Sequence, residues 1–165
     1  MTGYKRNIIL GGFMATGKSS VGRRLAIVLG YDFLDLDTLI AAEEGMPISE
    51  VFTTRGEGTF RALETRMVER VAGRTGCVVA TGGGTIVNPR NLEALKRSGV
   101  VVALTADPDT IVARIGPTED RPMLWGGDKR ERVRLLLEQR AEAYAKADLI
   151  VDASARTIDH VVNHI

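Results

Sequence analysis

The chain has 165 residues, of which 44% are hydrophobic and 26% charged; this composition suits one ordinary globular domain over residues 1–165 and excludes general disorder. Its 22 Lys and Arg against 21 Asp and Glu leave a formal net charge of +1, so we expect no broad basic surface for nucleic acid or for an anionic membrane. The single cysteine, Cys77, excludes an internal disulfide and fits a cytoplasmic location, and no run approaches the roughly 18 apolar residues of a transmembrane helix.

The first half of the chain alternates between strand-like and helix-like segments. Asn7 to Leu10 is an aliphatic run typical of a buried strand. Val21, Leu25 and Val28 then recur at helical spacing until Gly30, which ends that helix. The elements expected after it are a strand over 33–36, a helix over 38–45, a short helix around 48–52, a longer helix over 60–73 and a strand over 77–80.

The second half continues the same alternation. Asn88 before Pro89 is a helix-start signal, and Asp107 before Pro108 repeats it. We expect strands over 100–104 and 149–151, a long loop over 116–128, and helices over 133–144 and 158–165. Because parallel strands need helical crossovers, the pattern predicts a three-layer α/β/α fold with a five-stranded parallel sheet.

One complete phosphate-binding motif follows the first strand. The run Gly12-Phe13-Met14-Ala15-Thr16-Gly17-Lys18-Ser19 matches G-x-x-x-x-G-K-[ST] in full. Its glycines let main-chain amides surround phosphate oxygens at the start of the next helix, with Lys18 reaching the β- and γ-phosphates and Ser19 reaching Mg²⁺. A glycine turn with an exposed lysine is the alternative, which the flanking strand and helix disfavour. No N-K-x-D sequence is present, which argues against a translational-type GTPase.

Two carboxylates, Asp35 and Asp37, stand at the end of the second predicted strand. Strand alternation predicts that both point to one face, at the carboxyl edge of the sheet where ligands bind. One can organise the hydration shell of Mg²⁺, and the other can accept a proton from an attacking hydroxyl. In the alternative reading, Asp37 caps the following helix and Asp35 is solvated.

Taken together, the motifs resemble those of the shikimate kinase family over essentially the full chain. Besides the P-loop, the matching pieces are Leu34-Asp35-Leu36-Asp37, Gly56-Glu57-Gly58-Thr59-Phe60-Arg61 with Glu64, Gly82-Gly83-Gly84, Arg121-Pro122-Met123-Leu124, and Arg140 with Tyr144. The resemblance implies a P-loop kinase fold with a substrate-binding helical segment at about 38–64 and a mobile lid at about 116–128. It also implies ATP-dependent phosphorylation of the 3-hydroxyl of shikimate, in chorismate and aromatic amino-acid biosynthesis.

The resemblance also implies roles for individual residues. The implied catalytic residues are Asp37, Lys18 and Arg121, and the implied substrate-binding residues are Asp37, Arg61, Gly82, Gly83, Gly84 and Arg140. ATP is expected to contact Gly12, Ala15, Thr16, Gly17, Lys18, Ser19, Ser20, Arg114, Arg121 and Arg156, while Ser19 and Asp35 serve Mg²⁺.

The chemistry of several of these residues supports the implied roles but leaves alternatives. Guanidinium groups match a carboxylate in geometry, which suits Arg61 and Arg140 to an acidic substrate. Arg61 can instead pair with Glu57 or Glu64 on a solvated helix face. The glycine triplet can be a flexible turn, and Arg121 can lie on a solvated loop.

The expected partners are shikimate and ATP with Mg²⁺, without nucleic acid or membrane, and the expected state is a monomer. Three other functions stay open: a gluconate-type kinase, a nucleoside monophosphate kinase, and a nucleotide-sensing domain. The Asp35/Asp37 pair with the glycine triplet argues against the gluconate-type kinase. The presence of Lys18 and Arg121 beside Asp37 argues against a mere sensor.

Overall fold

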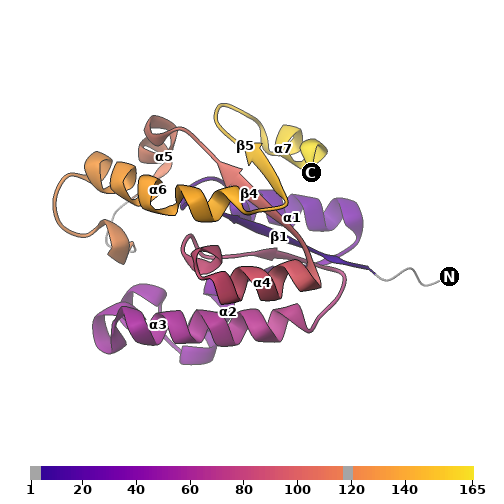
Figure 1. Ribbon diagram of the computed structural model, residues 1–165, viewed down its shortest axis with the longest axis horizontal. Helices are drawn as coiled ribbons and strands as arrows, with labels where there is room; N and C mark the ends of the chain where they lie inside the picture. Colours follow the sequence, from indigo (N-terminus) through magenta and orange to yellow (C-terminus); the bar gives the residue numbers. More distant parts are fainter. Residues whose placement is uncertain (1–4, 117–120) are drawn as a thin grey trace.

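Five parallel strands form one sheet in the order β2-β3-β1-β4-β5. Figure 1 labels β1, β4 and β5 of this sheet. The computed structural model describes residues 5–116 and 121–165. The strands are β1 (Asn7–Gly12), β2 (Asp32–Asp35), β3 (Cys77–Ala80), β4 (Gly99–Thr105) and β5 (Leu149–Asp152). The central strand, β1, pairs with β3 on one side and β4 on the other, so the loop after β1 lies in the middle of the carboxyl edge.

Seven helices are seen in the described residues; α4 and α5 start where the sequence indicated, whereas α2 and α6 begin two and four residues earlier than expected. They are α1 (Lys18–Leu29), α2 (Leu36–Glu44), α3 (Ile48–Ala72), α4 (Pro89–Ser98), α5 (Pro108–Arg114), α6 (Lys129–Ala145) and α7 (Ile158–His164), with 3-10 turns at Thr85–Val87 and Pro122–Leu124. Asn88 and Asp107 cap α4 and α5 as expected, their side chains accepting from the amides of Arg90 and Thr110. Gly30 ends α1 in the left-handed conformation.

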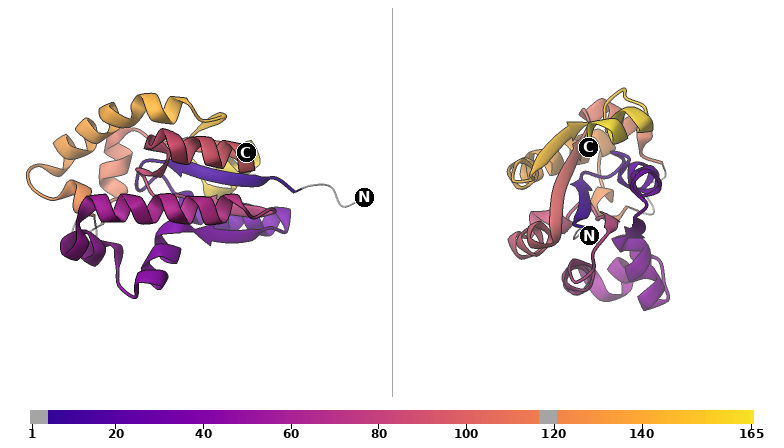
Figure 2. Two further views of the ribbon diagram at one scale, coloured as in Figure 1. Left: turned by 60° about the horizontal axis from the view of Figure 1, so that its bottom comes forward. Right: turned by 90° about the vertical axis from the view of Figure 1, so that its right-hand side faces the viewer.

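The two faces of the sheet are covered by different helices because side chains alternate along each strand. Ile9, Val79 and Val101 belong to the larger hydrophobic cluster, which includes side chains of α3, α4 and α6. Leu10, Val78 and Val102 belong to a second cluster with side chains of α1 and α7. Figure 2 shows helices on both sides of the sheet, which confirms the three-layer α/β/α prediction.

The segment between α2 and β3 contains the expected pair of helices, joined directly at a kink. Ile48 to Ala72 runs as one helical element, but Gly56 interrupts it with φ 82° and ψ 167°, a conformation that glycine tolerates best. The two helices that the sequence predicted are therefore confirmed, and the second begins earlier than Phe60, directly after Gly56. Arg55 before the kink pairs with Glu44 of α2, and Arg70 after it pairs with Glu43. Ion pairs thus link α2 to α3 on both sides of the kink.

The helical stripes predicted for α1 and α7 are only partly buried. Val21 and Leu25 are buried, whereas Val28 and Ile158 are exposed. Helical spacing predicts a face but not its width, which depends on the neighbouring elements. None of the helices in the described part of the chain is both long and apolar enough to cross a membrane. Of the predicted 116–128 loop, residues 117–120 lie outside the described residues, and the rest includes the turn Pro122–Leu124.

Candidate functional site

The P-loop lines a cavity of about 340 Å³ at the carboxyl edge of the sheet, which we call the P-loop cavity. Most residues predicted to hold phosphate or metal line it: Ala15, Gly17, Lys18, Ser19, Ser20 and Asp35. Gly12 lies just outside, and its main-chain oxygen accepts a hydrogen bond from Lys18. The loop joins the end of β1 to the first residue of α1, so main-chain amides and the positive end of the helix dipole gather at one point.

Lys18 is a buried cation held by the loop itself. Its Nζ donates to the main-chain oxygens of Gly12 at 2.8 Å and Phe13 at 2.7 Å. Burial lowers the pKa of Lys18 to about 8, and the charge of Asp37 opposes that shift. The ammonium therefore stays mostly protonated at neutral pH and suits the phosphates of a nucleotide.

Asp35 and Ser19 form the oxygen pair of the P-loop cavity. The Ser19 hydroxyl donates to Oδ2 of Asp35 at 2.6 Å, and Oδ1 of Asp35 accepts from the amide of Thr38 at 3.2 Å. Asp35 thus ends β2 and caps α2, while Asp37 lies in the first turn of that helix. Both acids face the same cavity as expected, but strand alternation is the wrong reason, because the strand ends one residue earlier than predicted. The alternative of a cap at Asp37 is wrong too.

The pair Ser19–Asp35 fits a hard divalent cation such as Mg²⁺. Both groups offer oxygen, and both line the P-loop cavity. Within residues 5–116 and 121–165, no three His, Cys, Asp or Glu side chains form a group that could hold a metal. One hydroxyl and one carboxylate suit Mg²⁺, which keeps several waters and binds through one or two protein oxygens plus phosphates.

Asp37 is a half-buried carboxylate with spare hydrogen-bonding capacity. Its Oδ1 is buried and has no hydrogen-bond partner among the described residues. Burial, followed by the nearby charges of Glu64 and Asp35, raises the pKa of Asp37 to about 6. A carboxylate with a raised pKa is a better proton acceptor, and a buried unpartnered oxygen is suited to a ligand hydroxyl.

A second cavity of about 100 Å³, which we call the arginine cavity, adjoins the P-loop cavity. Asp37 and Arg121 line both cavities, as do Met14, Gly82 and Gly83. The arginine cavity also contains Arg61, Arg140 and Gly84, with apolar walls from Phe52 and Phe60. The predicted catalytic and substrate residues are therefore brought together, with Asp37 and Arg121 placed between the two spaces.

Arg61 pairs with Glu57 and Glu64, as the alternative to a substrate-binding role predicted. It nevertheless lines the arginine cavity as well. Its Nη1 donates to Oε2 of Glu64 at 2.6 Å, and its Nη2 lies 3.4 Å from Oε1 of Glu57. Glu64 is 1% exposed, and its Oε1 accepts from the hydroxyl of Thr85 at 2.7 Å. The sequence assigned Glu64 no site role, although its i,i+3 spacing from Arg61 was the available indication.

Arg140 is a buried cation that the described residues do not neutralise. It is 6% exposed and forms no salt bridge within the described part of the chain. Its guanidinium carbon lies 5.7 Å from the ring centre of Phe13. Because an unpaired buried charge is costly, this arrangement indicates a site for an anionic ligand.

The glycine triplet permits both arginines to reach the cavity. A Cβ on Gly84 would lie 2.6 Å from Nη1 of Arg61, and a Cβ on Gly83 would lie 3.2 Å from Nη1 of Arg140. The hydroxyl of Tyr144 donates to the main-chain oxygen of Gly83 at 2.6 Å, which fixes the loop. The close approach of these side chains thus favours glycine at both positions.

A third cavity of about 240 Å³ contains both residues expected at the base of the nucleotide, Arg114 and Arg156. We call it the α7 cavity, since Ile158 and Val161 form part of its wall. Thr16 lines this cavity alone, whereas Ala15, Gly17 and Ser20 line both this cavity and the P-loop cavity. Arg114 is fixed by a 3.0 Å bond from Nη2 to the main-chain oxygen of Ala153. The three cavities therefore form a continuous series along the carboxyl edge.

Comparison with known proteins agrees with this arrangement. Residues 14–165 match the family model described as shikimate kinase. A shikimate kinase of Geobacter metallireducens is 45% identical over 160 residues, covering 97% of this chain and 89% of that protein. The solved shikimate kinase of Acinetobacter baumannii in complex with shikimate is 34% identical with a TM-score of 0.93, covering 97% of this chain and 90% of that one.

A gluconokinase from Sinorhizobium meliloti is more distant, at 19% identity and a TM-score of 0.59 over 97% of this chain and 89% of that one. This likeness concerns the fold alone. The family model and the relatives at 34–45% identity decide the classification. The chain belongs to the shikimate kinase family.

Proposed function

We propose that this protein catalyses the ATP-dependent phosphorylation of the 3-hydroxyl of shikimate, forming shikimate 3-phosphate and ADP, in chorismate and aromatic amino-acid biosynthesis. One observation carries the proposal most directly. Asp37 and Arg121 lie between a P-loop cavity and a cavity that holds two arginines. A triphosphate and a small acid bound in these spaces would meet at these two side chains.

The acceptor is oriented by the arginine cavity. Shikimate carries one carboxylate, which Arg140 can neutralise, with Arg61 as the second guanidinium. Its hydroxyls then face Asp37, whose Oδ1 has no hydrogen-bond partner among the described residues and can accept from the reacting hydroxyl. The apolar side chains Phe52 and Phe60 limit the space available to the ring.

Transfer then requires one proton acceptor and several cations. The substrate oxygen forms a bond to the γ-phosphorus, the bond from that phosphorus to the β–γ bridging oxygen breaks, and the hydroxyl proton passes to Asp37. Lys18 and Arg121 stabilise the charge on the transferring group. Mg²⁺ would be held by Ser19, with Asp35 ordering its waters, and would neutralise phosphate charge.

The nucleotide is expected along the P-loop and α7 cavities. Phosphates would contact the loop from Gly12 to Ser20, and the base would lie between the guanidinium groups of Arg114 and Arg156. We further propose that the chain acts as one domain and as a monomer, because one chain supplies every residue of the proposed site. The substrate segment at about 38–64, the lid at about 116–128 and the cytoplasmic location stay predictions.

The direct test is ADP release by the purified protein with shikimate present and absent, together with mass spectrometry of the product. We expect ADP release that depends on shikimate and a product heavier by one phosphoryl group. Gluconate, AMP and CMP serve as alternative acceptors in the same assay. Turnover with one of these and none with shikimate would support the gluconate-type or nucleoside monophosphate kinase instead.

A further inference from the structure

The short turn Pro122–Leu124 and the residue before it supply two side chains of the proposed site. Arg121, which precedes it, lines both the P-loop cavity and the arginine cavity, and Met123 lines the arginine cavity. Leu124 is buried in the larger hydrophobic cluster. A displacement of this turn would therefore move a cation and a cavity wall together.

The turn satisfies only part of its own hydrogen bonding. The amide of Leu124 donates to the oxygen of Arg121 at 2.9 Å, and the amide of Trp125 donates to that of Pro122 at 3.2 Å. The next oxygen, on Met123, accepts instead from Nη2 of Arg132 at 3.3 Å, across nine residues of sequence. Terminal carbonyls of such a turn need a partner from outside it, and Arg132 supplies one.

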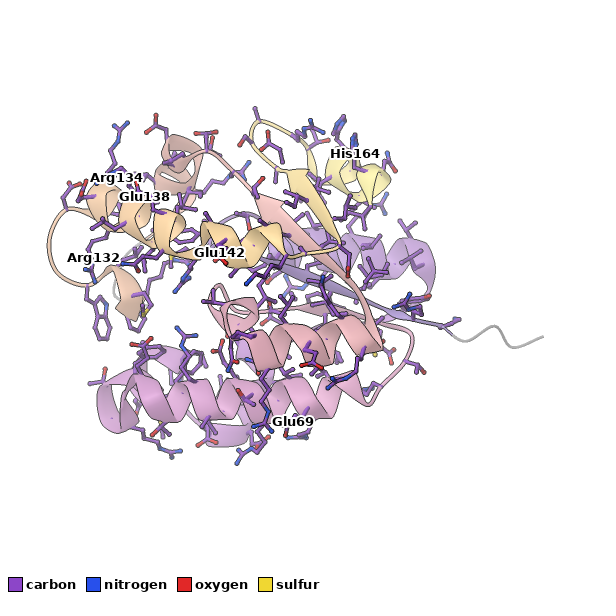
Figure 3. All side chains as sticks on the ribbon, in the orientation of Figure 1. Glu69, Arg132, Arg134, Glu138, Glu142 and His164 are labelled. Carbon is purple, nitrogen blue, oxygen red and sulfur yellow. The ribbon has the colours of Figure 1, made fainter. Side chains whose placement is uncertain are left out.

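Arg132 differs from its neighbours at the start of α6. Arg130 pairs with Asp109 at 2.7 Å, and Arg134 pairs with Glu131 and Glu138, both at 2.6 Å. Arg132 forms no salt bridge within the described residues, and its Nε is buried without a hydrogen-bond partner among them. In Figure 3, Arg134 and Glu138 lie on the upper side of α6, whereas Arg132 lies on the side of the short turn. Arg132 is therefore not an ordinary surface charge.

The start of α6 is well anchored, so it can hold another segment. The Asp128 side chain caps the helix by accepting from the amide of Glu131 at 2.9 Å, and the amide of Arg132 donates to the oxygen of Asp128 at 3.0 Å. The pair Arg130–Asp109 links the same turn to α5. Arg132 thus extends from a helical turn that is capped by Asp128 and linked to α5.

We propose that Arg132 is a positioning residue, whose bond to the main-chain oxygen of Met123 holds the Pro122–Leu124 turn against α6 and so places Arg121 and Met123 at the site. The effect on turnover rests on the proposed function. The effect on the turn does not, because it concerns the protein without substrate.

Trp125 makes the turn observable, since it is the only tryptophan of the chain and directly follows the turn. The experiment compares the full-length wild type with Arg132→Ala, Arg132→Lys and the control Arg134→Ala, which removes a neighbouring arginine that pairs at the surface. Three quantities are measured: Trp125 emission of the free protein, kcat and KM with shikimate, and the Kd of a non-hydrolysable ATP analogue without acid. Thermal unfolding is followed for each variant.

We expect Arg132→Ala to change Trp125 emission and to lower kcat/KM by about tenfold, the scale of losing one charge-assisted hydrogen bond. The Kd of the analogue should rise by at most about threefold, because Arg132 itself lines neither the P-loop cavity nor the α7 cavity and acts on the nucleotide only through Arg121, one of several predicted ATP contacts. Arg132→Lys keeps the charge and should recover part of both effects, and Arg134→Ala should match the wild type.

The inference is overturned if emission and kcat/KM of Arg132→Ala match those of the wild type, or if one changes without the other. Should Arg132→Ala fail to fold, Arg132→Lys still decides, since it is expected to fall between the wild type and complete loss in both measurements. A wild type that does not phosphorylate shikimate would refute the proposed function alone, because the fluorescence comparison remains a test of the turn.

Discussion

The guanidinium of Arg61 donates to the buried carboxylate of Glu64, with Nη1 2.6 Å from Oε2. The other oxygen of Glu64 accepts from Thr85. This arrangement connects α3 to the segment after the glycine triplet, and it fixes one of the two arginines of the arginine cavity.

Replacing Glu64 by Gln should therefore weaken substrate binding. The amide cannot offer two acceptor oxygens, so Arg61 loses its closest partner, and KM for shikimate should rise about tenfold, as expected for one charged hydrogen bond. Glu57→Gln is the matched control, because Glu57 lies farther from Arg61 and is exposed. Steady-state kinetics check both variants. A fall in KM would mean instead that Glu64 competes with the substrate for Arg61.

Arg140→Ala should mainly raise KM for shikimate, by about 10- to 100-fold, because this side chain holds a part of the substrate that does not react. Its kcat should change much less. Since Arg140 is a buried cation without a salt bridge in the described residues, its removal should also not lower thermal stability strongly. If KM hardly changed, the carboxylate would have to bind elsewhere.

Gly84→Ala should act through Arg61. The added Cβ would lie 2.6 Å from Nη1 of Arg61, so the guanidinium must move and KM for shikimate should rise. Gly58→Ala is the control, since a Cβ there meets nothing within 4 Å, and it should leave KM unchanged. Equal effects of the two substitutions would contradict the role assigned to the triplet.

Asp37→Asn should lower kcat by at least about 100-fold, the scale of losing a general base. Binding of ATP without acid should stay nearly intact, which isothermal calorimetry can measure. Asn is close to Asp in size, so the fold should persist, and thermal unfolding checks this. An active Asp37→Asn enzyme would show that another group accepts the proton.

Removal of divalent cations should abolish turnover, and added Mg²⁺ should restore it. Ser19→Ala removes the hydroxyl that is bonded to Asp35 and should raise the Mg²⁺ concentration needed for half-maximal rate. Ser20→Ala, beside it on α1, should have a smaller effect on this concentration. Full activity in excess chelator would refute the metal assignment.

The sequence alone determined the features that depend on residues close together in the chain. The P-loop was predictable because its whole motif is contiguous and lies between a strand and a helix. The caps at Asn88 and Asp107 were predictable because a cap bonds to amides two or three residues away. The five parallel strands followed from the alternation of apolar runs and helical stripes. The family resemblance named the other site residues.

Only the tertiary structure decided which side chains meet across the chain. Strand spacing could not show that Asp35 caps α2 while Asp37 turns into the space between two cavities, because the exact end of β2 depends on its packing. Likewise, Glu64 contacts Thr85 and Arg132 contacts Met123 only because separate elements pack together. Contacts between residues far apart in the sequence depend on how the helices cover the sheet. A local sequence pattern carries no information about which of these residues meet.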